Sequence, residues 1–538
     1  MHYARIRRRP TPFRRVHRKN HPMKCAPRVL ALATALALLA ACGGSGQDTS
    51  PPPPAATPQR GDLIDKPPQK LATYAPSDLL ALLSGSDLGK TFLQVAYTPI
   101  CSVTVYHLTY QTVDPKGNIT PASGALMVPS GDDTGCTGAR PLVLYAHGTT
   151  TDRNFDISQL DGSNNAEAVL LAAVFAAEGY VVVAPNYVGY DTSTLDYHPY
   201  LIADQQAKDM IDSLTAARAA LPTSDAPNSS DGGKLFITGY SQGGYVAMAT
   251  HSAMQSAGMT VTASAPMSGP YALAAFGDAI FEGQVNKSAT VNLALVLSAY
   301  QRAYGDIYSA PTDVFESKYA ASVETLLPST TPVSELQAQG KFPSAAFNST
   351  PPAPSYSIYT PATSPAYLAP VFAAGFGKDD LINNSYRGAY LSDALAAPDG
   401  GFPAVTDGLP AAKPTNHLRV HLKANDLRNW VPSAPTLLCG GNSDPTVFFF
   451  NTTLMGNYWV SHPPAAAPVI LDVDSAASSG DPYGSLKTAF GVAKDLVRTE
   501  AVVGGATDGG DAAVLDAYHA LLVPPFCLSA AKSFFDQH

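Results

Sequence analysis

The sequence predicts an α/β protein whose central sheet is mostly parallel, begins with an antiparallel hairpin and is interrupted by a long insertion. Three observations support this fold class. Two β-prone runs flank the turn Asp-Pro-Lys-Gly-Asn. Short apolar runs then alternate with helical patterns, which is typical of parallel strands covered by helices. Finally, residues 272–432 break this alternation before the last two strands.

The hairpin is predicted over residues 103–111 and 122–128. The continuous apolar runs 141–148 and 180–186 predict central strands that are buried on both faces. Between them, residues 166–179 show a helical pattern that ends at a glycine. The later predicted elements are a helix at 203–221, a strand at 234–238, a helix that stops at Gly258, strands at 261–268, 434–444 and 467–474, and a closing helix rich in Ala and Phe.

The insertion over residues 272–432 combines helical pieces with stretches rich in Pro, Ser and Tyr. It is too long for a plain loop. We expect a lid or cap domain that divides the core into two parts, residues 76–271 and 433–538.

A serine lies between two glycines where a predicted strand meets a predicted helix, in Gly239-Tyr240-Ser241-Gln242-Gly243. The Gly-x-Ser-x-Gly pattern alone is weak evidence, but the strand–turn–helix context is that of a nucleophile elbow. Such a turn holds the serine in a strained backbone above the carboxyl edge of the sheet. Gly239 and Gly243 let strand and helix pass close together.

The order of these elements over residues 95–535 resembles the α/β-hydrolase family, with the serine turn after the fifth strand. The string Gly-Tyr-Ser-Gln-Gly-Gly also occurs in cutinases, which are compact and have no lid. The large insertion more closely resembles the secretory lipases and esterases. The resemblance implies hydrolysis of carboxylic esters through a Ser-Asp-His triad and an acyl-enzyme, with no metal or organic cofactor.

In this family the acid follows the nucleophile in the chain. Asp444 comes directly after the predicted seventh strand, in Gly-Gly-Asn-Ser-Asp-Pro-Thr-Val, which resembles the family's acid loop. The alternative is a turn aspartate that caps the next helix. Asp472 and Asp474 are rival candidates because they end the eighth strand.

The catalytic base comes last in the family's order, and His519 precedes the final helix as that order requires. His462 lies before the eighth strand, and His538 is the last residue. One feature departs from the family. The histidine usually follows the eighth strand closely, whereas a helical segment separates that strand from His519 here.

The oxyanion hole needs two backbone N–H donors. We expect the first from Gln242, at the start of the elbow helix, where the helix dipole also favours negative charge. His147-Gly148 resembles the family's His-Gly motif, which makes Thr149 the second donor and Thr150 an alternative. The motif could also be a plain strand-ending turn. The aromatic residues of 184–201 could line a pocket or serve loop packing.

The N-terminal segment, residues 1–41, is predicted to be a signal for export. Its apolar run follows basic residues and is too short to span a bilayer. The run ends in Leu-Ala-Ala-Cys42, which resembles the lipobox of bacterial lipoproteins and implies lipidation of Cys42. In this class, Gly43 rather than Asp after the cysteine implies sorting to the outer membrane. The region before the apolar run is unusually long, and a start at Met23 would give a signal of normal length, so we expect Met23 to be the true start. The alternative is an ordinary cleaved signal and secretion. Residues 42–75 are predicted to be a Pro/Gly-rich tether.

Charge and cysteines restrict the partners and the compartment. Removing the signal, with its ten positive and no negative charges, takes the net charge from −9 to −19, which argues against nucleic-acid binding. We expect a small-molecule or lipid ester as substrate and membrane contact through the lipid anchor only. Four further cysteines predict two disulfides in an exported chain, with three possible pairings; the alternative is four buried free thiols. Cys439 and Cys527 flank Asp444 and His519, and Cys101 and Cys136 flank the hairpin, so these are the predicted pairs.

Two rival functions remain. A serine peptidase can use the same fold and the same triad. A catalytically silent hydrolase fold could be displayed as a binding protein, although it would have little reason to keep all three triad residues.

Overall fold

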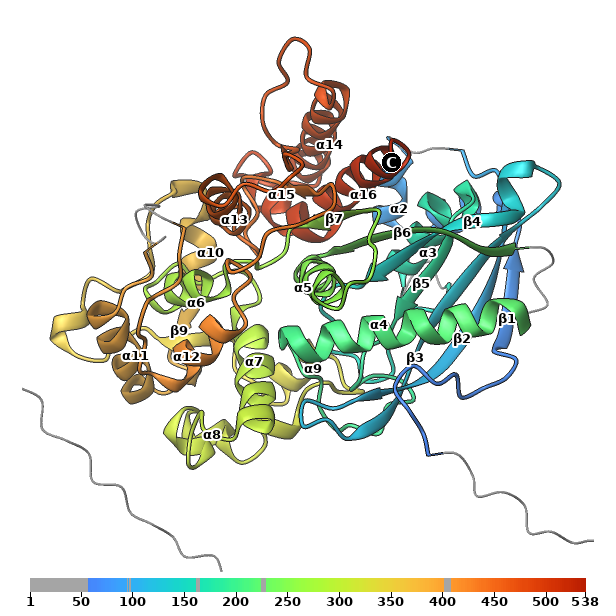
Figure 1. Ribbon diagram of the computed structural model, residues 1–538. Coiled ribbons are helices and arrows are strands. Elements are labelled where there is room, and N and C mark those ends of the chain that lie inside the picture. The colour runs from blue at the N-terminus through green and yellow to red at the C-terminus, as the bar shows by residue number, and fades with distance from the viewer. Residues whose placement is uncertain (1–56, 94, 96–97, 161–164, 224–228, 401–407) are drawn as a thin grey trace, which may run out of the picture. The chain divides into compact units, whose positions relative to one another are not determined.

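The computed structural model describes residues 57–538 except 94, 96–97, 161–164, 224–228 and 401–407 (Figure 1). The predicted signal, its start at Met23 and the lipidation site Cys42 lie outside the described residues.

A nine-stranded sheet forms the centre of the described chain, in the order β1-β2-β3-β5-β4-β6-β7-β11-β12. The pairs β1–β2, β2–β3 and β3–β5 are antiparallel, and all later pairs are parallel. The hairpin and the six later strands predicted from sequence are all present. The strands are β1 (Gln69–Tyr74), β2 (Ser102–Val113), β3 (Ile119–Ser130), β4 (Gly138–Ala146), β5 (Val181–Pro185), β6 (Ser229–Tyr240), β7 (Ala263–Met267), β11 (Leu437–Gly440) and β12 (Val469–Asp472).

The end of the predicted tether at residue 75 is wrong. β1 pairs with β2, and Arg60 forms an ion pair with Asp212 of the core, so the chain packs on the sheet from about residue 60 onward. β1 is an edge strand with no fully buried residue. It therefore lacks the continuous apolar run that identifies the central strands, and the prolines near it favoured a tether.

Helices cover both faces of the sheet (Figure 1). Along β5, Val181 and Val183 pack in the hydrophobic cluster that contains α4 and α5, whereas Val182 and Ala184 pack with α3 and α16. This alternation explains why the strand is apolar throughout. The helices are α1 (Pro76–Ser84), α2 (Asp87–Phe92), α3 (Ala166–Val174), α4 (Ala203–Ala220), α5 (Gln242–Ser256), α13 (Phe450–Ser461), α14 (Gly484–Val503), α15 (Asp511–Ala517) and α16 (Val523–Phe535).

Among the described residues, Asp511–Phe535 is long and apolar enough to cross a membrane. More than half of its most apolar window is buried inside the protein, as in a core helix.

The described residues between β7 and β11 form seven α-helices and a small sheet in the order β10-β8-β9. Most of the buried hydrophobic side chains of this segment belong to the same cluster as those of α4 and α5, so it shares the core of the protein. Its role as a lid stays a prediction. The elements are α6 (Leu273–Phe281), α7 (Ala289–Tyr304), α8 (Ser317–Ala320), α9 (Val333–Ala338), β8 (Ala345–Asn348), α10 (Ala369–Ala374), β9 (Phe376–Gly377), β10 (Asp380–Ile382), α11 (Asn384–Ala396) and α12 (His417–Ala424).

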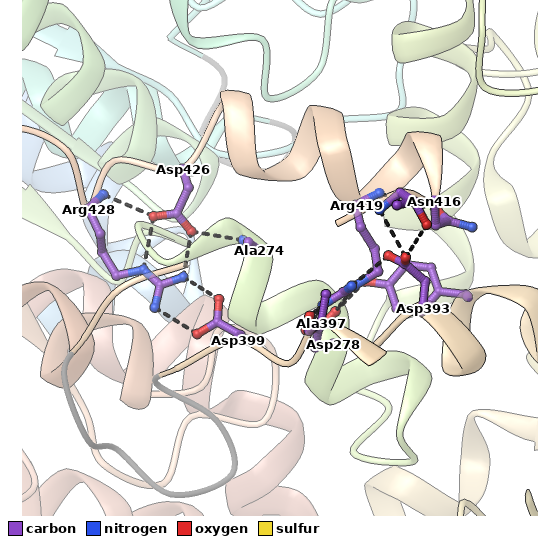
Figure 2. A network of polar contacts seen from close by, with 11 residues as sticks. Ala274, Asp278, Asp393, Ala397, Asp399, Asn416, Arg419, Asp426 and Arg428 are labelled. Carbon is purple, nitrogen blue, oxygen red and sulfur yellow. Dashed lines mark hydrogen bonds and ion pairs between the residues drawn. The ribbon is translucent and has the colours of Figure 1, made fainter. Parts of the chain in front are cut away.

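Buried ion pairs connect the helices of this segment (Figure 2). Arg419 of α12 binds Asp278 of α6 at 2.7 Å and Asp393 of α11 at 2.6 Å. Nearby, Arg428 lies between Asp399 and Asp426 and is fully buried. Removing one partner of such a network leaves an uncompensated buried charge, so α6, α11 and α12 are held in one arrangement.

Candidate active site

The elbow at Ser241 has the strained backbone expected of a nucleophile turn. β6 ends at Tyr240, α5 begins at Gln242, and Ser241 between them has φ 60° and ψ −121°. Positive φ is uncommon for a non-glycine residue. A Cβ on Gly239 would clash with the carbonyl oxygens of Gly243 and Ala146, and a Cβ on Gly243 would clash with Ala146. Both glycines are therefore required by close packing of strand, helix and β4.

Ser241, His519 and Asp444 form one hydrogen-bonded chain. Ser241 Oγ lies 2.8 Å from His519 Nε2, and His519 Nδ1 lies 2.7 Å from Asp444 Oδ2. Asp444 is 2% exposed, and its other oxygen accepts hydrogen bonds from the N–H groups of Thr446 and Val447. A carboxylate at Nδ1 fixes the proton there and leaves Nε2 free to accept the serine proton.

His519 reaches the serine by a route that the family's usual spacing does not predict. α14 and α15 fill the gap after β12, and His519 lies in a π-helical turn, Tyr518–Leu522, directly before α16. Such turns are rare and are frequent at functional sites. Tyr240 Oη donates to the His519 carbonyl at 2.7 Å, which also holds the turn near the elbow.

Two links hold the acid loop against the histidine segment. The predicted disulfide Cys439–Cys527 is present and joins β11 to α16. In addition, Tyr518 Oη donates to Asp474 Oδ2 at 2.6 Å and accepts from the Ser443 N–H at 3.1 Å. The second predicted disulfide, Cys101–Cys136, is also present.

The rival acids and bases have other contacts. Asp472 accepts from the N–H and side chain of Asn442, and Asp474 binds Tyr518 and Lys494. His462 Nδ1 contacts a carbonyl of its own helix, α13. The His538 carbonyl accepts from the Lys234 ammonium.

The two candidate oxyanion donors line the same cavity as Ser241. Gln242 is the first residue of α5, where N–H groups have no partner within the helix. In the described part of the chain, neither the Gln242 nor the Thr149 N–H donates to a protein acceptor. The Gly148 N–H is taken by Glu167 at 3.2 Å. Thr149 lines the cavity and Thr150 does not, which favours Thr149 as the second donor.

Two histidines near the site, His147 and His198, are buried, and the contact of His198 with Gln242 was not predicted. His198 donates from Nδ1 to the Val188 carbonyl, and its Nε2 accepts from the Gln242 side chain at 2.6 Å. Burial lowers the pKa of His198 to about 3 and that of His147 to about 4, so both are neutral at physiological pH. The density of aromatic residues in 184–201 was the available signal. Most of them pack in the loop, and Tyr200 lines the cavity.

A cavity of about 570 Å³ opens at Ser241. Its lining comes from two groups of elements, which we call the insertion side and the core side. Insertion-side residues include Leu273, Phe276, Ile280, Val296, Leu418 and Leu422; core-side residues include Leu88, Tyr145, Glu167, Leu170, Pro524 and Leu528. Among the described lining residues, Glu167 and His519 are the only acidic or basic side chains.

One group of described side chains could hold a metal ion: His107, Asp156 and Asp191. His107 Nε2 already lies 2.8 Å from Asp191 Oδ2, and the Ser123 hydroxyl donates to the same oxygen. None of these residues lines the cavity. The expected absence of a metal or cofactor stays a prediction.

Comparison with known proteins supports the same fold. The sequence profile of the prolyl oligopeptidase family matches residues 168–290, a span that includes Ser241 but neither Asp444 nor His519. A crystal structure of the rice cell wall degrading esterase LipA from Xanthomonas oryzae is similar at 26% identity, covering 84% of this chain and 100% of that one, with a TM-score of 0.58. A ligand-bound form of LipA aligns at 24% identity over 89% and 100% of the two chains, with a TM-score of 0.63.

No curated protein matches the chain. The predicted α/β-hydrolase fold is confirmed, and the matches support a serine hydrolase.

Proposed function

We propose that this serine hydrolase of α/β-hydrolase fold cleaves carboxylic ester bonds with Ser241 as nucleophile. The observation that carries the proposal is the hydrogen-bonded chain from Ser241 through His519 to Asp444, of which Ser241 and His519 line a large, mostly apolar cavity. A serine hydroxyl needs a base within reach and a third group that orients the base, and these three side chains meet both conditions.

In the first half-reaction, the Ser241 hydroxyl proton passes to His519 Nε2 while Oγ bonds to the ester carbonyl carbon. The carbonyl oxygen becomes an oxyanion, for which the Gln242 and Thr149 N–H groups are the candidate donors. Collapse of the intermediate breaks the bond to the alcohol. The protonated His519 gives its proton to the leaving oxygen, and the acyl group stays on Ser241.

In the second half-reaction, a water molecule gives a proton to His519 and attacks the acyl carbon. The bond to Ser241 Oγ breaks, the serine regains its proton, and the carboxylic acid leaves. Asp444 stabilises the imidazolium in both halves by accepting from Nδ1–H.

An ester substrate is favoured over a peptide by two observations. The cavity lining is mainly aliphatic, with few groups that could pair the N–H and C=O groups of a peptide. LipA, a solved structure that is covered over its full length by the match to this chain, is described as an esterase, whereas the oligopeptidase profile matches only residues 168–290.

The test is a panel of p-nitrophenyl esters of increasing chain length, run beside aminoacyl p-nitroanilides. We expect ester hydrolysis that Ser241→Ala lowers by a factor on the order of 10⁴ or more without unfolding the protein. Near-normal activity of the variant would remove Ser241 from the mechanism, and turnover of anilides alone would favour the peptidase. Failure of Ser241 to react with a fluorophosphonate would support the silent binding protein.

We also propose export and lipidation at Cys42. The support is indirect: two disulfides are typical of proteins outside the cytosol. Cys42→Ser should move the protein from the detergent phase to the aqueous phase, or leave it unprocessed. An unchanged membrane fraction would contradict the lipoprotein hypothesis.

A further inference from the structure

Glu167 lies in an unusual position for a carboxylate. It belongs to the first turn of α3, is only partly exposed, and lines the active-site cavity. A Cβ placed on Gly148 would lie 3.8 Å from Glu167 Oε2 and 3.9 Å from Ser241 Cβ. The carboxylate and the nucleophile therefore face the same small region beside the oxyanion loop.

The two oxygens of Glu167 differ in their contacts. Oε1 accepts from the Tyr145 hydroxyl at 2.7 Å and from the Gly148 N–H at 3.2 Å. Within the described chain, Oε2 has neither a hydrogen-bond donor nor a cation as partner. Burial raises the pKa of this carboxyl group, which reflects the cost of its charge in an apolar surrounding.

Apart from Glu167, Ser241, His519 and the uncharged polar residues Thr149, Thr151, Gln242 and Thr446, the core side of the cavity is apolar or aromatic. Leu88, Leu170, Pro524 and Leu528 line it together with the Tyr145 ring. An unpaired carboxylate among such side chains is unfavourable unless a ligand brings a donor or a positive charge. A cation that reaches Oε2 would gain a charge-assisted hydrogen bond or ion pair in a weakly solvated site.

The core side is also where the leaving group is expected. Ala520, Pro524 and Leu528, which line it, follow His519 closely in the chain. His519 must deliver its proton to the leaving oxygen, so the alcohol part of an ester lies next to this histidine. The apolar insertion side then remains for the acyl chain.

From this geometry we propose that Glu167 selects esters whose alcohol part carries an ammonium group, which binds at Oε2 on the core side of the cavity. This inference rests on the proposed ester hydrolysis. Glu167 is a specificity residue and takes no part in bond making or breaking.

The experiment compares butyrylcholine with 3,3-dimethylbutyl butyrate, its neutral isostere, in the wild-type protein and in Glu167→Gln. The glutamine oxygen can still accept from Tyr145 and Gly148, so only the charge is lost. The quaternary ammonium of choline has no N–H, so it binds Oε2 as an ion pair only. The Coulomb attraction at about 5 Å in a partly buried site, less the cost of desolvation, predicts a fall of about 10- to 100-fold in kcat/KM for the choline ester and a change within about twofold for the neutral ester. Glu500→Gln, the same substitution at an exposed position of α14, should change neither.

Equal losses on both esters would show a merely structural role and overturn the proposal while leaving ester hydrolysis intact. If Glu167→Gln lowered kcat/KM only for esters that carry the ammonium group on the acyl part, the assignment of the alcohol part to the core side of the cavity would be overturned.

A second measurement uses only the wild-type protein and does not depend on substrate turnover. Choline should slow fluorophosphonate labelling of wild-type Ser241 more than 3,3-dimethylbutanol does at equal ionic strength. Equal protection by the two alcohols would overturn the proposal even if the chain hydrolysed no ester.

Discussion

Removal of the disulfide between Cys439 and Cys527 should lower the catalytic rate before the fold melts. The perturbation is the double variant Cys439→Ala/Cys527→Ala. The bridge spans 88 residues, for which the chain-entropy model gives about 4.6 kcal/mol of unfolding free energy at 25 °C. Strain and residual structure in the unfolded chain make measured losses smaller.

The chain offers a matched control in the second disulfide. Cys101–Cys136 spans 35 residues, for which the same model gives about 3.8 kcal/mol. Its removal should cost comparable stability, but it lies outside the segments that carry Asp444 and His519. Comparing the two double variants therefore separates loss of stability from loss of geometry.

We expect kcat of the Cys439/Cys527 variant to fall about tenfold at temperatures well below its unfolding temperature. Misplacement of a catalytic group by about 1 Å can lower the rate about a hundredfold. The expected loss is smaller because Tyr518 still joins Ser443 to Asp474 in the variant. The assay is kcat on a short p-nitrophenyl ester at 15 °C, beside urea unfolding of both variants. An unchanged kcat, or equal losses in the two variants, would refute the reasoning.

Three further outcomes follow from the same structure. Arg419→Ala should lower the unfolding free energy by about 3–5 kcal/mol because it removes the cation that two buried carboxylates share. Arg218→Ala, at a more exposed ion pair, should cost at most about 1 kcal/mol. Equal falls of the urea midpoint in the two variants would contradict this expectation. Leu422→Trp should reduce the cavity on the insertion side and lower kcat/KM for long-chain p-nitrophenyl esters more than for the acetate, and a uniform loss would remove Leu422 from acyl selection. Burial lowers the pKa of His198 to about 3 and of His147 to about 4. As the pH falls from about 6.5 toward 4, these histidines are protonated in the unfolded chain but not in the folded one, so the free energy of unfolding should fall. A urea midpoint that stays constant over this range would show that neither histidine is held neutral.

Local patterns in the sequence were sufficient for most of the central sheet. Strands such as 141–148 and 180–186 are buried on both faces, so their apolar runs are continuous and visible in a short window. β1 escaped prediction because an edge strand has neither that run nor a clear alternation. The backbone of the elbow was equally local, since two glycines and a serine between strand and helix define it.

The partners of Ser241 needed more than a local pattern. Asp444 and His519 could be chosen because the family's chain order left few candidates, but their contact depends on a π-helical turn after α14 and α15. Such a turn is stabilised by packing against the elbow and the acid loop, far away in the sequence.

The sequence by itself therefore determined the order of the central strands and helices, the candidate nucleophile and a short list for its partners, because these depend on residues that are neighbours in the chain. Only the tertiary structure decided that Glu167 faces Ser241, that His198 holds Gln242, and that Arg419 joins three helices of the insertion. Glu167 and Arg419 have no distinctive sequence context, and around His198 the sequence shows only a cluster of aromatic residues. The roles of these side chains arise from their removal from water and from partners that lie far away in the sequence and meet only in the folded protein, which no local sequence pattern encodes.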